Sequence, residues 1–249
     1  MKRTSRFTMI KKHIPNTLTC CNLLSGCLAT YQAMSCDMER ALIFIIIGAA
    51  FDFFDGLSAR LLNVSSPIGK ELDSLADNIT FGFAPATMVC NELCNVNAPG
   101  LPESAISYVP FIGLLIAAFS ALRLAKFNLD TRQATSFIGL PTPANALFWA
   151  ALITAHGKAI ECLDWAMPAI IALILLSCWL LVAEIPMFAL KFKHWGIKGN
   201  EVRYFFLAVS AALLLLIGVI ESLPVIVVLY ILLSITLWLW PGKSTGKTA

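Results

Sequence analysis

Charged residues are scarce in this sequence. Only 13% of its 249 residues are Asp, Glu, Lys or Arg, whereas a soluble domain carries about 25%. Hydrophobic residues make up 58% of the chain, and the mean hydropathy is +0.79. Low charge with high hydrophobicity excludes a disordered chain and argues against a water-soluble domain. The composition therefore predicts an all-α polytopic membrane protein.

The cysteines lack the spacing of a zinc site. The eight Cys include no CxxC pair and no Cys/His pattern of metal ligands, so free thiols inside apolar runs are the expected state. The chain also has no visible repeat of 20–50 residues, and we expect no nucleic-acid partner.

Long apolar stretches are what the chain has in abundance. A bilayer span needs about 20 predominantly apolar residues. Eight stretches approach this length, at residues 17–35, 41–62, 69–92, 107–126, 141–160, 165–187, 203–221 and 224–241. We therefore expect about eight transmembrane helices.

The positions of Lys and Arg predict the orientation of these spans. With the N-terminus inside, 16 of the 18 Lys and Arg fall in inner segments, and only Arg40 and Lys158 fall in outer ones. Basic residues concentrate on the cytoplasmic side of membrane proteins. An even number of spans, with both termini cytoplasmic, follows.

The N-terminal segment has an amphipathic pattern. Phe7, Ile10 and Ile14 recur at helical spacing, while basic residues are available for the opposite side. This pattern predicts that residues 1–14 form an interfacial helix on anionic headgroups. The alternative is a basic tail that only enforces the topology.

Four aspartates interrupt the second and third spans. An Asp at the centre of a span costs about 2.5–3.5 kcal/mol on insertion scales, so Asp52, Asp55, Asp73 and Asp77 need compensation. Asp52 and Asp55 lie at i, i+3, and Asp73 and Asp77 lie at i, i+4, so each pair shares a helix face. The short link between the two spans makes them antiparallel neighbours, and all four carboxylates converge near the cytoplasmic side.

Converging carboxylates favour a hard divalent cation. Oxygen-only ligands suit Mg²⁺, Mn²⁺ or Ca²⁺, and four carboxylates exceed the needs of one Mg²⁺, so two ions are expected. An interhelical hydrogen-bond or ion-pair network and a cation-permeation site are the alternatives.

The residues around these aspartates form a specific motif. Residues 52–77 read DxxDGxxAR(x8)GxxxDxxxD, which resembles the signature of the CDP-alcohol phosphotransferase family at all eight of its fixed positions. Other segments resemble the branch of bacterial-type phosphatidylserine synthases: IPNTLTCCNLLSG (14–26), FGFAP (81–85), ALRLAKFN (121–128) and FIGLPTPAN (137–145).

The resemblance implies a fold and a reaction. It implies a six-helix catalytic core, often dimeric, within a bacterial inner membrane and with the active site on the cytoplasmic side. The implied reaction transfers a phosphatidyl group from CDP-diacylglycerol to the hydroxyl of L-serine and releases CMP. The expected division is 1–14 for the interfacial helix, 15–200 for the core, 201–241 for two additional helices and 242–249 for a cytoplasmic tail.

The resemblance also assigns roles within the motif. It implies that Asp52, Asp55 and Asp73 hold one metal ion, while Asp52, Asp73 and Asp77 hold or border the second. Asp77 is the expected catalytic base. The residues expected to bind the nucleotide are Thr19, Asn22, Gly56, Ala59, Arg60 and Gly69. The alternative role for Arg60 is to tie the helices to an acidic side chain.

Polar residues outside the motif reach the same membrane level. Thr19 and Asn22 are expected to read the cytosine or ribose, or else to pack between helices. Arg123, Lys126 and Asn128 are expected to bind serine or a lipid phosphate, because an Arg side chain pairs bidentately with carboxylates and phosphates. Anchoring the span at the inner surface is the alternative role for Arg123.

Two other functions fit parts of the pattern. The motif also allows a synthase that uses glycerol 3-phosphate, inositol phosphate or choline as the acceptor. A cation carrier or channel would also use carboxylates, although such proteins usually distribute them over several spans.

Overall fold

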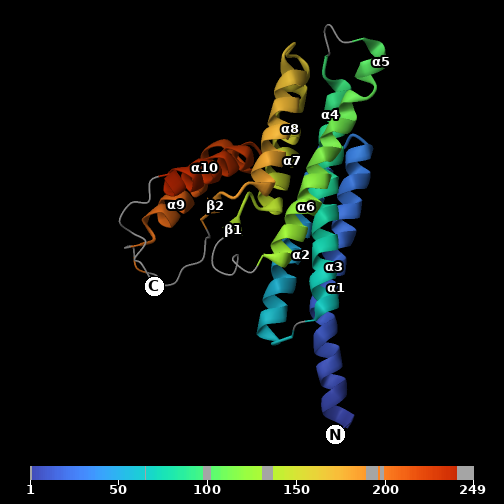
Figure 1. Ribbon diagram of the computed structural model, residues 1–249, viewed down its shortest axis with the longest axis vertical. Coiled ribbons are helices and arrows are strands. Elements are labelled where there is room, and N and C mark those ends of the chain that lie inside the picture. The colour runs from blue at the N-terminus through green and yellow to red at the C-terminus, as the bar shows by residue number, and fades with distance from the viewer. Residues whose placement is uncertain are drawn as a thin grey trace.

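The computed structural model describes residues 2–64, 66–97, 102–130, 137–188, 196 and 199–239. Its main body is a bundle of long helices that run side by side (Figure 1). The bundle helices are α1 (Lys2–Met34), α2 (Met38–Leu61), α3 (Pro67–Asp77), α4 (Ala84–Asn95), α6 (Leu115–Leu129), α7 (Thr142–Glu161) and α8 (Ala166–Val182). Two single turns, α5 (Glu103–Ile106) and the 3₁₀ helix η2 (Val109–Leu114), lead into α6.

The N-terminal segment continues into the first span as one helix. α1 runs from Lys2 to Met34 with Pro15 inside it, and its first turns project beyond the end of the bundle (Figure 1). The interfacial position of residues 1–14 stays a prediction, and the side chains of residues 1–12 lie outside the described part of the chain. The predicted tail, residues 242–249, also lies outside it.

A tight turn reverses the chain between α2 and α3, and both helices pack against α1. At the end of α2, Asn63 adopts a left-handed conformation (φ 50°), and the amide of Val64 donates to the carbonyl of Ala59 at 3.0 Å. This is the hydrogen-bond pattern of a Schellman cap. Ser66 then caps α3 by accepting from the amide of Gly69 at 3.0 Å, and Pro67 occupies the first helical position, where its missing N–H costs nothing.

The third span is a single helical segment with a π-helical insert. The π-helix η1 (Asn78–Phe83) joins α3 to α4 without a break. π-Helical turns are rare and occur often at functional sites. This one begins directly after Asp77, the last aspartate of the motif.

Glycines allow α1, α2 and η1 to approach closely at Thr80. A Cβ atom on Gly26 would collide with Thr80, and one on Gly48 would lie 2.5 Å from Thr80 Cγ2. The Thr80 hydroxyl donates to the carbonyl of Asn22 at 3.0 Å. This close packing sets the distance between the first span and the motif-bearing third span.

The sixth span ends earlier than the sequence predicts. The expected span covers 165–187, but α8 ends at Val182, and residues Pro186–Met187 form the strand β2. β2 pairs antiparallel with β1 (Phe137–Ile138), and the amide of Gly139 donates to the carbonyl of Ile185 at 2.9 Å. This pairing draws the chain after α8 out of the helix and against the start of α7.

The last two helices differ in position and boundary from the expected spans. α9 (Glu201–Ile217) and α10 (Val219–Leu239) meet at Gly218, whose φ of 92° suits glycine. The predicted break at 222–223 is therefore wrong, and Pro224 lies inside α10. Both helices lie at a steep angle to the bundle (Figure 1), so the count of eight spans stays a prediction.

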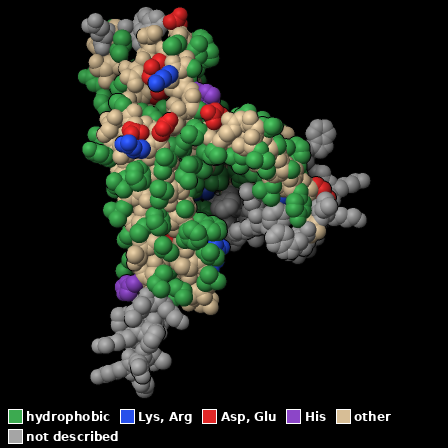
Figure 2. All heavy atoms as spheres, turned by 180° about the vertical axis from the view of Figure 1, so that it is seen from behind, with side chains coloured by type: hydrophobic (Ala, Val, Ile, Leu, Met, Phe, Trp, Pro, Cys, Tyr) green, Lys and Arg blue, Asp and Glu red, His purple; other side chains and the backbone are tan. Residues whose placement is uncertain are grey.

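The surface of the bundle is suited to lipid. Apolar side chains cover most of the face seen in Figure 2, with charged groups confined to small patches. By length and composition, three helical segments of the described chain could cross a membrane, at Met38–Leu62, Ser104–Leu129 and Val219–Leu239. The predicted class, an all-α polytopic membrane protein, is confirmed.

Candidate active site

Three of the four motif aspartates form one cluster. Asp52 and Asp55 come from α2 and Asp73 from α3, and one carboxylate oxygen of each lies within 4.8 Å of the other two. Asp55 is buried, and the other two are half-buried. Buried Asp73 Oδ1 has no hydrogen-bond partner among the described residues. These three carboxylates could hold a divalent metal ion, because they offer only hard oxygen ligands and leave one oxygen unsatisfied.

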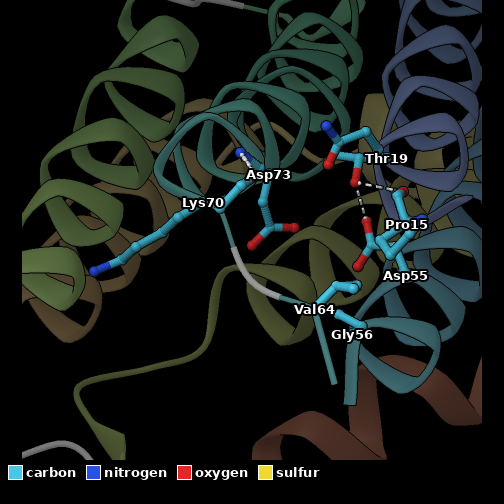
Figure 3. A pocket seen from close by; sticks show the side chains of 11 residues that line it. Pro15, Thr19, Asp55, Gly56, Val64, Lys70 and Asp73 are labelled. Carbon is cyan, nitrogen blue, oxygen red and sulfur yellow. Dashed lines mark hydrogen bonds between the residues drawn. The ribbon is translucent and has the colours of Figure 1, made fainter. Parts of the chain in front are cut away.

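A residue of the first span fixes one carboxylate of the cluster. The Thr19 hydroxyl donates to Asp55 Oδ2 at 2.6 Å and lies 3.0 Å from the carbonyl oxygen of Pro15 (Figure 3). Thr19 is 3% exposed. Hydrogen bonds of this kind orient carboxylate ligands toward a metal.

The fourth motif aspartate is held by a residue of the first span. Asp77 Oδ1 accepts from Asn22 Nδ2 at 3.0 Å, and both side chains are buried. Asp77 is not a member of the three-carboxylate group. Its predicted roles as a ligand of the second metal ion and as the catalytic base stay predictions.

The motif aspartates have no basic partner in the described part of the chain. None of the four forms an ion pair with a described Lys, Arg or His. Lys70 is near in sequence, but its amino group points away from Asp55 and Asp73 (Figure 3) and donates to the carbonyl of Asn128 at 3.0 Å. An ion-pair network therefore does not compensate these carboxylates within the described residues.

A pocket opens beside the cluster, and we call it the acidic pocket. Its cavity volume is about 260 Å³. Asp55 and Asp73 lie on its wall (Figure 3). It is lined by Pro15, Asn16, Thr19, Asp55, Gly56, Ala59, Val64, Ser66, Gly69, Lys70 and Asp73. A Cβ atom on Gly56 would meet nothing within 4 Å, so the absence of a side chain there leaves space for a ligand.

The residues expected to bind the nucleotide divide into two groups. Thr19, Gly56, Ala59 and Gly69 line the acidic pocket, and Asn22 and Arg60 do not. Asn22 contacts Asp77, as described above. The exposed Arg60 donates through Nε to the carbonyl of Gly56 in its own helix at 3.0 Å.

Sequence reasoning missed several residues that line the acidic pocket. Asn16, Ser66 and Lys70 contribute polar groups to its wall. Asn16 lies within the IPNTLTCCNLLSG segment and Ser66 precedes the motif glycine, so their positions in the sequence could have indicated them.

The basic residues of the fourth span belong to a second pocket. Arg123 is only 6% exposed. Its Nη1 lies 3.5 Å from the hydroxyl of Thr142, and its guanidinium stacks over the Phe127 ring at 5.3 Å. Arg123 Nε has no hydrogen-bond partner among the described residues, and neither has the side-chain amide of the buried Asn145.

We call this second cavity the mixed-charge pocket because its charged residues carry both signs. Its volume is about 300 Å³. It is lined by Arg123, Lys126, Leu129, Asp130, Ile138, Leu181, Val182, Ala183 and Glu184. Sequence reasoning indicated Arg123 and Lys126 but missed Asp130 and Glu184.

Asn128 lies between the two pockets and contacts protein. Its Nδ2 donates to the Ser74 hydroxyl at 2.8 Å, and its carbonyl accepts from Lys70. These bonds tie α6 to α3. They do not test the expectation that Asn128 binds serine or a phosphate, which stays a prediction.

Together, the fold and the site define a polytopic helical membrane protein with a carboxylate cluster beside a pocket. A family model matches residues 12–179, that of the CDP-alcohol phosphatidyltransferases. The chain therefore belongs to the CDP-alcohol phosphatidyltransferase family, a family of phosphotransferase enzymes. The matched region ends within α8, before the two steeply inclined helices.

Named relatives support the same family. A protein of Bacillus subtilis (strain 168) is 38% identical over 135 residues, which cover 53% of this chain and 70% of that protein. One of Helicobacter pylori (strain 26695) is 30% identical over 229 residues, 91% of each chain. One of Saccharomyces cerevisiae (strain S288c) is 34% identical over 161 residues, 55% of this chain and 52% of that protein. All three are named CDP-diacylglycerol–serine O-phosphatidyltransferase.

Proposed function

We propose that this protein is a phosphatidylserine synthase that transfers the phosphatidyl group of CDP-diacylglycerol to L-serine and releases CMP. The observation that carries the proposal is the cluster of Asp52, Asp55 and Asp73, which lies beside a pocket and has no described basic partner. The family membership and the shared name of the relatives support the choice of reaction and acceptor.

The carboxylates fit a divalent metal, and we propose that two ions bind, each Mg²⁺, Mn²⁺ or Ca²⁺. Asp52, Asp55 and Asp73 would hold the first ion, and Asp52, Asp73 and Asp77 would hold or border the second. When bound, the ions supply positive charge that neutralises a diphosphate and stabilises the leaving nucleotide. Thr19 keeps Asp55 oriented for this task through its 2.6 Å hydrogen bond.

The protein residues would bind the donor and accept a proton. In the proposed step, the serine hydroxyl oxygen forms a bond to the lipid-side phosphorus, and the bond from that phosphorus to the CMP oxygen breaks. CMP leaves with the electron pair, and the serine proton passes to Asp77. A base must lie within hydrogen-bond reach of the proton that it removes, and Asn22 fixes the orientation of Asp77. Gly56, Ala59 and Gly69 would border the nucleotide in the acidic pocket.

The proposal also covers the orientation in the membrane, the oligomeric state and the residues that bind the acceptor. Both termini and the site would lie on the cytoplasmic side of a bacterial inner membrane, and the enzyme would act as a homodimer. Arg123 and Lys126 would bind the acceptor or a lipid phosphate, because both line the mixed-charge pocket.

The acceptor can be tested directly with the purified protein in liposomes. Labelled CDP-diacylglycerol is supplied with L-serine, glycerol 3-phosphate, inositol phosphate or choline in turn, and CMP and the lipid product are measured. We expect CMP release to depend on L-serine. Release that depends on another acceptor would favour a different synthase of the family. Cation flux without any phosphatidyl transfer would favour a carrier or channel.

A further inference from the structure

The mixed-charge pocket places two cations and two carboxylates around one small cavity. Arg123 and Lys126 come from α6, Asp130 follows the end of α6, and Glu184 follows the end of α8. A pocket that bound only a phosphate would gain nothing from two carboxylates, because they repel an anion. Charges of both signs instead match a ligand that carries both signs itself.

The chain holds Glu184 at this pocket through backbone pairing. Residues after α8 bond to the segment before α7, through the β1–β2 pair and the bond from the Gly139 amide to Ile185. The amide of Leu140 also donates to the carbonyl of Leu180 at 2.9 Å. Two segments more than 40 residues apart thus place a carboxylate opposite the basic end of α6.

The inner wall of this pocket has an unsatisfied donor. Arg123 is 94% buried, and its Nε lacks a partner among the described residues. A buried guanidinium donor without a partner is costly, and a bound carboxylate would satisfy it in the bidentate geometry that Arg prefers. Lys126 is exposed and adds a second positive charge at the rim.

Hydrogen bonds join α6, which lines the mixed-charge pocket, to α3, which lines the acidic pocket. Asn128 of α6 contacts both Ser74 and Lys70 of α3, and Lys70 also lines the acidic pocket. A ligand in the mixed-charge pocket would therefore contact α6, the helix that is bonded to α3, and α3 carries the proposed base Asp77.

We propose that the mixed-charge pocket recognises the zwitterion of a free amino acid, with Asp130 and Glu184 as the residues that bind its ammonium group. The inference rests on the proposed function and deepens it, because it explains how the enzyme would select serine over an acceptor without an amino group. Arg123 and Lys126 bind the carboxylate, Asp130 and Glu184 bind the ammonium, and the hydroxyl is left to face Asp77. The cavity, about 300 Å³, is at the small end of the range for ligand sites.

The test compares Glu184→Gln and Asp130→Asn with the native enzyme in liposomes. Loss of a charged hydrogen bond costs a factor of about ten to a hundred in binding. Each variant should raise KM for L-serine by about that factor and leave KM for CDP-diacylglycerol within twofold. Glu184→Asp should restore part of the serine affinity. Glu39→Gln, an exposed change near the start of α2, is the matched control and should change neither constant.

A competitor separates recognition of the ammonium from a structural role. 3-Hydroxypropanoate has the hydroxyl and carboxylate of serine but no ammonium, so its inhibition constant should change less than twofold in Glu184→Gln. An equal change for serine and this competitor, a KM for serine within twofold of native, or a matching rise in KM for CDP-diacylglycerol would overturn the inference. If one amide variant fails to fold, the other carries the same test. Native enzyme that releases no CMP with serine would instead overturn the proposed function.

Discussion

The acidic pocket and the mixed-charge pocket differ in charge and in construction. The carboxylates of the acidic pocket have no described basic partner, and all of its lining comes from residues 15–73. The acidic pocket also contains Lys70, but its amino group points away from Asp55 and Asp73. The mixed-charge pocket has two cations and two carboxylates, and its lining comes from three segments spread over residues 123–184. The first is built by neighbouring helices, and the second by elements that are far apart in sequence.

This difference indicates what each pocket can bind. Clustered carboxylates inside a membrane protein are costly unless a cation compensates them. The acidic pocket is therefore expected to bind metal ions, and these ions would bind a diphosphate. Balanced charges compensate one another in part and do not require a metal. They fit an uncharged or zwitterionic ligand. The following predictions test whether the two pockets bind these different ligands.

Metal should bind at one pocket only. We expect a chelator to abolish CMP release and added Mg²⁺ or Mn²⁺ to restore it. At about 100 times its dissociation constant, a metal stabilises a native protein by about 2.7 kcal/mol. The resulting rise in Tm should be present in the native protein and in Glu184→Gln. It should be absent in Asp52→Asn and Asp73→Asn, and a rise in these variants equal to the native one would contradict the assignment.

Substitutions at the two ends of the motif should affect substrate binding and turnover differently. Asp77→Asn should keep affinity for CDP-diacylglycerol but lower turnover by about 10²–10⁴-fold, the usual contribution of a general base. Asp52→Asn should lose both the affinity for CDP-diacylglycerol and the turnover, because Asp52 belongs to the three-carboxylate cluster. Binding of labelled CDP-diacylglycerol with metal present, together with single-turnover rates, measures the two effects.

The exposed Glu71 of α3 offers a matched control for these changes. Glu71→Gln removes a carboxylate from the same helix and should preserve both binding and turnover. If Asp52→Asn and Asp77→Asn lose CDP-diacylglycerol binding equally, the separation of roles is wrong.

Thr19 should affect the acidic pocket without being a metal ligand. Thr19→Val removes the 2.6 Å hydrogen bond to Asp55, and loss of such a partner typically weakens metal binding 10–100-fold. Titration of activity with Mn²⁺ measures this change, while KM for serine at saturating metal should stay near native. Thr17→Val is the control, since the only bond of the exposed Thr17 hydroxyl within the described residues is to the His13 carbonyl of its own helix. Equal metal affinities in the two variants would rule out this role.

Substitution of two glycines should have the smallest effects. These substitutions distinguish a glycine needed for helix packing from one that leaves space for a ligand. Gly48→Ala puts a Cβ atom 2.5 Å from Thr80 Cγ2, and overpacking of this kind costs about 1–3 kcal/mol. Its Tm in detergent should fall. Gly56→Ala meets nothing within 4 Å, so its Tm should stay native while KM for CDP-diacylglycerol rises. A lower Tm in Gly56→Ala with unchanged KM would show that Gly56 serves packing.

The acidic pocket was largely predictable because its geometry is local. Helical spacing alone places Asp52 beside Asp55, and the short connection after α2 returns the chain so that Asp73 of α3 reaches the same carboxylate cluster. The helical class and most span positions follow from apolar runs of membrane length. The same local patterns could not locate the end of α8, the break at Gly218 or the angle of the last two helices.

Helical spacing and apolar spans were thus enough for the sequence by itself to indicate the membrane class, the reversal of the chain between α2 and α3, and a carboxylate cluster. The structure groups three of the four carboxylates expected in that cluster. Only the tertiary structure decided that Asp77 bonds to Asn22, that Lys70 turns away to α6, and that Glu184 lines the same pocket as Arg123. The physical reason is distance along the chain. Side chains within one helix or one helical hairpin are placed by the regular backbone, whereas contacts between remote segments depend on pairing such as that of β1 with β2, which no local pattern encodes.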